Sequence, residues 1–178
     1  DDEIAGVLYS TLFAGHETTS TFMGNYVLAM MNNRDAWEAV KTDPSKIPNA
    51  VEEMLRYTPS VVGWRRKARN AKTIGGVELP EGAEILMITG SANRDESKFP
   101  NGEALDIDRK NARTHLSFGY GIHRCLGARL AELQLTTLIE EMAKRDMAVK
   151  SVGEPERLPS CFTNGFEHIT VTMSRNHG

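Results

Sequence analysis

The residues best suited to metal chemistry lie in positions 115–132 of this sequence. Cys125 follows a loop that contains Gly119 and Gly121. It precedes apolar residues at roughly helical spacing, namely Leu126, Leu130, Leu133, Leu138 and Met142. This spacing predicts a helix that begins at or just after Cys125, and the positive end of a helix dipole favours a thiolate. The two glycines allow backbone N–H groups to point at the sulfur, so the pattern indicates a thiolate metal ligand.

Three interpretations of Cys125 stay open on the residues alone. The first is a buried, inert thiol, which is the usual state of a lone cysteine. The second is a zinc ion held by His115, His123 and Cys125, which is disfavoured because no second C-x-x-C or H-x-x-x-H pair accompanies them. The third is a thiolate ligand of haem iron, with His123 free to meet a haem carboxylate.

A second stretch whose residues could take part in chemistry, residues 14–19, lies inside a helix predicted for residues 1–31. Gly15 falls where another apolar residue would continue the series Ile4, Leu8, Leu12, Phe22, Tyr26 and Met30. A glycine inside a helix costs about 1 kcal/mol relative to alanine, so it calls for a reason. It either admits close helix packing or leaves a shallow groove beside a ligand, in which case Thr18 can bond the Ala14 carbonyl and loosen the helix.

The remaining pattern predicts a mainly α chain with small β-sheets. Further helices are expected over residues 34–41, from near Pro48 to before Pro59, and from Cys125 to about Arg145. Strands are expected within residues 73–88, with a Gly75-Gly76 hairpin turn and a mostly buried strand over 84–88, and again over 147–152 and 168–173. Glu53 and Arg56, spaced i,i+3, alone indicate only a surface pair worth about 0.2–0.5 kcal/mol.

Composition excludes several classes of function. The chain has 178 residues and a net charge of −3, which gives no general reason to expect nucleic acid as a partner. No apolar run approaches the length of a membrane span, so no membrane association is expected. Its two cysteines and the lack of a signal-peptide pattern suit a reducing, cytoplasmic setting, with Cys161 as a free thiol.

The stretch from Phe118 to Gly127, followed by Ala131, resembles the haem-binding signature of the cytochrome P450 family. This resemblance implies haem b as the cofactor, with Cys125 as the axial iron ligand. It places four further residues at the haem, namely Phe118, Gly119, Gly127 and Ala131. His123 and Arg66 would meet the propionates. Arg65 is the rival of Arg66, and for His115 a structural hydrogen bond is favoured over a second propionate contact.

Residues 14–19 resemble the family's oxygen-activation motif. The resemblance implies that Ala14 and Gly15 line a groove over the haem, that Thr18 hydrogen-bonds dioxygen or its water, and that Glu17 feeds protons from solvent. Glu53 and Arg56 match a pair that, in this family, forms a buried structural network with a later arginine, here Arg109. The substrate would contact two segments, represented by Val61, Val62 and Gly63 and by Phe162 and Thr163.

The family resemblance implies a monooxygenase that inserts one oxygen atom from O2 into a small apolar substrate. Electrons would come from NAD(P)H through a reductase and a ferredoxin-type partner, as in the soluble bacterial members. A peroxide-driven peroxygenase and a non-catalytic haem-binding or interaction fragment are the alternatives. Since family members are more than twice as long, residues 1–178 are expected to be the C-terminal part of a single domain whose N-terminal half is absent.

Overall fold

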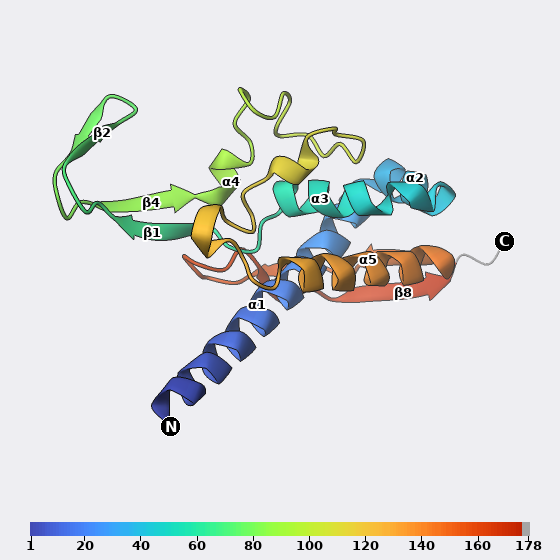
Figure 1. Ribbon diagram of the computed structural model, residues 1–178. Helices are drawn as coiled ribbons and strands as arrows, with labels where there is room; N and C mark the ends of the chain where they lie inside the picture. The colour runs from blue at the N-terminus through green and yellow to red at the C-terminus, as the bar shows by residue number, and fades with distance from the viewer. Residues whose placement is uncertain (176–178) are drawn as a thin grey trace.

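Helices form the frame of the molecule (Figure 1). The computed structural model describes residues 1–175. The α-helices are α1 (Asp2–Asn32), α2 (Arg34–Thr42), α3 (Ile47–Tyr57), α4 (Thr89–Ala92) and α5 (Ala128–Lys144). Short 3-10 turns are η1 (Pro44–Lys46), η2 (Ala112–Thr114) and η3 (Gly121–His123). Within residues 1–175 no helix combines the length and the apolar character needed to cross a bilayer.

The strands pair two by two, and each pair is antiparallel. They are β1 (Gly63–Lys67) with β4 (Glu84–Ile88), β2 (Lys72–Ile74) with β3 (Val77–Leu79), β5 (Met147–Ser151) with β8 (Val171–Arg175), and β6 (Glu156–Arg157) with β7 (Phe166–His168). The prediction of a mainly α fold with small β-sheets is therefore confirmed. Two-stranded sheets are marginally stable alone, and β1 contacts α4, β5 contacts α1 and α5, and β7 contacts α1.

The hydrophobic core lies where the C-terminal half of α1 meets α2, α3 and α5. Phe22, Tyr26 and Met30 recur at i,i+4 on α1 and are all buried. They form one cluster with residues of α3 and α5, among them Met54 and Ile139. This cluster fixes α3 within the frame, and α3 in turn positions the candidate site described below.

The N-terminal half of α1 differs from its C-terminal half. Ile4, Leu8 and Leu12, which continue the same apolar series, are 58%, 59% and 72% exposed. Figure 1 shows this part of the helix projecting away from the other elements. The helix prediction for residues 1–31 is confirmed, whereas the series of apolar residues is buried only from Phe22 onward.

Three expected details of secondary structure are wrong. Helix α5 begins at Ala128, three positions after Cys125, because residues 125–127 complete the preceding loop. Strand β4 is mostly exposed, since among residues 1–175 it pairs only with the polar strand β1. The expected strand over 168–173 is interrupted: β7 ends at His168 and β8 begins at Val171 with a different partner.

The hairpin turn at Gly75-Gly76 is confirmed. The two residues have φ of +56° and +81° and connect β2 directly to β3. Positive φ at both central residues is the type I′ geometry that matches the twist of a two-stranded ribbon. Glycine adopts it without the steric penalty that a side chain would bring.

Candidate functional site

The Cys125 loop is shaped by its own backbone. Gly119 and Gly121 have φ of +70° and +76°, in the left-handed region that glycine tolerates. The N–H of Cys125 donates to the carbonyl of Phe118 at 2.8 Å, which closes the loop around η3. The two glycines singled out in the sequence thus occupy the two positions of this loop that favour glycine for conformational reasons.

The loop presents Cys125 at the surface as a free thiol. Ile122 and Leu126, on either side of it, are 97% and 102% exposed. The interpretation of Cys125 as a buried, inert thiol is therefore wrong. The zinc interpretation also fails, since no three His, Cys, Asp or Glu side chains in residues 1–175 are grouped to hold a metal ion. A thiol framed by exposed apolar side chains fits a flat, largely apolar group that carries a metal able to bind sulfur.

The start of this loop is held against α3 through Ser117 and Asn93. The hydroxyl of Ser117 donates to the Leu55 carbonyl at 2.6 Å and accepts from the Asn93 amide at 2.9 Å. The Oδ1 atom of Asn93 accepts from the N–H of Leu116 at 2.8 Å, and the Asn93 side chain is fully buried. These bonds fix the residues that lead into Phe118 and the loop.

His115 connects the same segment to α3 by a second route. Its Nδ1 accepts from the N–H of Ser117 at 3.1 Å, and its Nε2 lies 3.2 Å from the carboxylate of Glu52. Since Nδ1 accepts, Nε2 is the ring nitrogen that donates to Glu52. The expected structural hydrogen bond of His115 is thus confirmed, and both ring nitrogens are engaged within the protein.

Glu52 is a buried carboxylate with two partners. Burial alone would raise its pKa, but the hydrogen bond from His115 and the guanidinium of Arg113, at 3.0 Å, hold that pKa below its ordinary value. The charged form of Glu52 is therefore the one that binds His115 and Arg113.

The neighbouring carboxylate, Glu53, contacts both of the arginines named with it in the sequence. Arg56 binds it through two N–H donors at 2.8 Å each, and Nε of Arg109 lies 3.2 Å from Oε1. Glu53 and Arg56 are fully buried, and the remaining donors of Arg56 bond the carbonyls of Asn93, Gly102 and Ala104. The network joins α3 to the coil that precedes the Cys125 loop.

The other predicted part of the site lies on α1. The hydroxyl of Thr18 donates to the Ala14 carbonyl at 2.8 Å, as the sequence predicts. A Cβ added at Gly15 would meet no atom within 4 Å, so helix packing within residues 1–175 does not account for this glycine. Glu17 and Thr18 are half-buried, and the Thr18 carbonyl accepts from the hydroxyl of Ser60 at 2.8 Å. That last bond ties this turn of α1 to the segment after α3.

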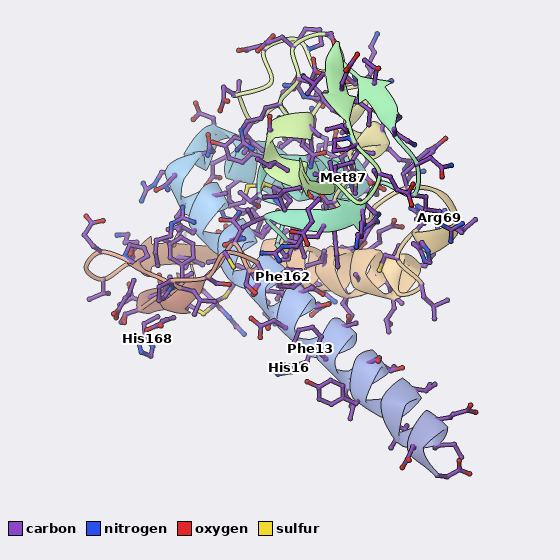
Figure 2. All side chains as sticks on the ribbon, turned by 90° about the vertical axis from the view of Figure 1, so that its left-hand side faces the viewer. Phe13, His16, Arg69, Met87, Phe162 and His168 are labelled. Carbon is purple, nitrogen blue, oxygen red and sulfur yellow. The ribbon has the colours of Figure 1, made fainter. Side chains whose placement is uncertain are left out.

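The two segments predicted to contact substrate lie against each other. Val61 and Thr163 form an isolated β-bridge, and the N–H of Val62 donates to the Phe162 carbonyl at 2.8 Å. Phe162 packs edge-to-face on Trp64, with ring centroids 5.3 Å apart. In Figure 2, Phe162 lies near α1 and the β1–β4 pair, with Phe13 and His16 further along α1. Packing also explains why residue 63 is a glycine, because a Cβ there would lie 2.5 Å from the Met87 carbonyl oxygen.

Strand β1 separates the two candidate arginines. Successive side chains of a strand point to opposite faces, so Arg66 shares its face with Trp64, whereas Arg65 lies on the other face. Arg66 is exposed and donates only to the neighbouring Arg65 carbonyl within residues 1–175. Because Trp64 contacts Phe162, this arrangement favours Arg66 as the one that faces the candidate site.

The sequence did not reveal the role of Asn164 and Asn25, whose hydrogen bonds connect the segments of the site. Asn164 donates from its backbone to the Ser60 carbonyl and from its side chain to the Pro59 carbonyl, at 2.8 and 2.9 Å. Its own carbonyl accepts from Asn25 of α1 at 2.7 Å. Asn164 thereby joins α1, the segment after α3 and the C-terminal loop. The only signal in the sequence is its place in the polar turn that also contains Phe162 and Thr163.

The comparisons with known proteins identify one family. A family profile described as Cytochrome P450 matches residues 45–145. Cytochrome P450 107B1 of Saccharopolyspora erythraea is 35% identical over 175 residues, covering 96% of this chain and 43% of that protein. The steroid C26-monooxygenase of Mycobacterium tuberculosis is 34% identical over 98% of this chain and 44% of its own length. The chain thus spans less than half the length of these relatives.

Among solved structures, cytochrome P450 CREJ in complex with (4-ethylphenyl) dihydrogen phosphate superposes with a TM-score of 0.91. It is 45% identical and covers 97% of this chain and 43% of its own.

Proposed function

Because this chain belongs to the cytochrome P450 family, we propose that it supplies the haem-thiolate site of a monooxygenase, with Cys125 as the iron ligand. The observation that carries this proposal is the Cys125 loop, in which two left-handed glycines present a free thiol between exposed apolar side chains. We further propose that residues 1–178 form the C-terminal part of a single domain.

The residues of the chain suit a bound haem b. Haem supplies a redox-active iron, and a thiolate ligand favours cleavage of the O–O bond of dioxygen. Cys125 would hold it from one side together with Phe118, Gly119, Gly127 and Ala131. Ala14 and Gly15 would lie at the other face, where the open space at Gly15 leaves room for a ligand. His123 and Arg66 would bind the propionates, for which the planar guanidinium of Arg66 offers two parallel donors.

Thr18 and Glu17 are proposed to form a proton relay. The Thr18 hydroxyl already donates to the Ala14 carbonyl, so its oxygen is oriented and can accept a further hydrogen bond. Cleavage of an O–O bond needs protons in a site that excludes bulk water, and the half-buried carboxylate of Glu17 lies one residue away to deliver them. Val61, Val62, Gly63, Phe162 and Thr163 would contact the substrate.

The substrate is proposed to be small and largely apolar. The paired segments around Val62 and Phe162 present apolar side chains, and one relative is named a steroid C26-monooxygenase. Electrons are proposed to come from NAD(P)H through a reductase and a ferredoxin-type partner. Arg124, which lies beside Phe118 in the Cys125 loop, is an exposed cation where an acidic partner could dock.

The absorption spectrum of the reduced, haem-loaded chain with carbon monoxide tests the ligand assignment. We expect the red-shifted Soret band of thiolate ligation, and we expect Cys125→Ser to abolish it. Cys161→Ser is the matched control, because Cys161 is the other free, exposed thiol. A thiolate band that survives Cys125→Ser would show that the assignment is wrong. Folded chain that takes up no haem would show that the site needs the rest of the domain.

Coupling of NAD(P)H consumption to product in the holoenzyme tests the proton relay. Thr18→Ala should release more peroxide and less product, while Thr19→Ala, one position further along the helix, should leave coupling near the parent value. Unchanged coupling in Thr18→Ala would remove Thr18 from the mechanism. Turnover with hydrogen peroxide alone, equally fast in Thr18→Ala, would instead identify a peroxygenase.

A further inference from the structure

A cavity of about 240 Å³ lies between α1, α2, α5 and β5. Met142 lines it near the C-terminal end of α5, whereas the Cys125 loop precedes the N-terminal end. With a rise of 1.5 Å per residue, Met142 lies about 20 Å along the helix from Ala128. The cavity is therefore separate from the candidate haem site.

Its inner wall is apolar and well fixed. Tyr26, Met30 and Met142 are buried, and the indole of Trp37 is held by a bond from Nε1 to the Met147 carbonyl at 3.1 Å. The phenol oxygen of Tyr26 is the one buried side-chain polar atom of residues 1–175 that lacks a hydrogen-bond partner. Because that oxygen is itself shielded, Tyr26 contributes apolar wall and no polar contact to a ligand in the cavity.

The same cavity is lined by three charged residues, Arg34, Glu38 and Lys150. Glu38 shares Lys41 with Asp146, since the Nζ of Lys41 lies 3.0 Å from Glu38 and 2.6 Å from Asp146. In the part of the chain that the structure describes, neither Arg34 nor Lys150 has a carboxylate partner. An apolar wall beside two unpaired cations complements a molecule with a hydrocarbon body and one negative end.

We propose that this cavity binds a small amphipathic carboxylate. The hydrocarbon part packs on Met30, Trp37 and Met142, and the carboxylate pairs with Arg34 and Lys150. A volume of about 240 Å³ has room for a molecule of the size of a medium-chain fatty acid. A neutral molecule of the same length gains only the hydrophobic part of the binding free energy.

Trp37 gives a direct readout of binding. The chain has two tryptophans, so Trp64→Phe leaves Trp37, in the cavity wall, as the sole indole. Titration of this variant with octanoate should change Trp37 fluorescence saturably, and 1-octanol should bind more weakly. Adding Arg34→Gln and Lys150→Gln should weaken octanoate binding about twofold to thirtyfold, the range for two partly exposed ion pairs, without changing octanol binding.

Lys72→Gln with Lys98→Gln is the matched control, because it removes the same charge from exposed positions outside the cavity. Ala148→Leu, which fills the cavity, should weaken both ligands while far-UV circular dichroism stays unchanged. No saturable fluorescence change, equal affinity for octanoate and octanol, or equal losses in the two double variants would overturn the proposal. The outcome of this titration does not depend on the carbon monoxide spectrum, so the test is independent of the proposed function.

Discussion

Glu52 and Glu53 are neighbours on α3 whose side chains serve different segments. Glu52 binds His115 and Arg113 near the entrance to the Cys125 loop. Glu53 binds Arg56 on its own helix and Arg109 in the preceding coil. Consecutive helical residues point in directions about 100° apart, which allows one turn of α3 to hold both segments. Because each carboxylate is buried, its partners set whether its charge stabilises or destabilises the fold.

Arg56→Ala should lower the free energy of unfolding by about 3–5 kcal/mol, because it leaves the charge of Glu53 buried without its partner on the same helix. Urea denaturation measures this loss. Arg129→Ala is the control, since Arg129 forms an i,i+3 pair with Glu132 but is exposed, and its loss should cost about 1 kcal/mol or less. Similar losses in the two variants would contradict the role given to the buried network.

At the scale of the elements, α1 is one helix with two environments. Its C-terminal half packs in the core, and Asn25 and Thr18 connect it to the segments around Asn164 and Ser60. Its N-terminal half contacts little else in residues 1–175, although its side chains are as apolar. Helical stability in proteins comes mostly from packing of an apolar face, so the two halves should differ in local stability.

Amide hydrogen exchange of the isolated chain should reveal this difference. Amides of residues 6–16 should exchange much faster than those of residues 22–32, because opening the first group exposes no buried side chain. The amides of α3, buried along most of its length, provide the slow reference. Uniform protection along α1 would mean that its N-terminal half is covered, for example by a second copy of the chain.

At the scale of the whole molecule, acid should destabilise the fold through Glu52. Its pKa is depressed in the folded state, so the stabilisation is fully present above the ordinary value of 4.5 and is lost as the pH falls through the depressed value. We therefore expect Glu52→Gln to flatten the fall of the free energy of unfolding below pH 4.5. Glu140→Gln, at an exposed position of α5, should leave that fall unchanged. Parallel acid curves for all three proteins would contradict this assignment.

Local periodicity was sufficient to predict α1, α2 and α3, because an apolar face and the prolines around it are encoded within each segment. The hairpin at Gly75-Gly76 was equally local. The exposure of Cys125 and of β4 could not be predicted, since it depends on what packs against them from elsewhere in the chain. The bonds of Asn93 and Asn164 join segments far apart in sequence, and no local spacing marks them.

Both parts of the candidate site are attached to α3 and to the few residues that follow it. Ser117 binds the Leu55 carbonyl within the helix, and Ser60 binds the Thr18 carbonyl just beyond its end. By contrast, the hairpin formed by β2 and β3 is exposed at every position but Leu79, which is half-buried. Related genes should therefore carry insertions and deletions at the tip of that hairpin, whereas the number of residues between Leu55 and Ser60 should stay constant.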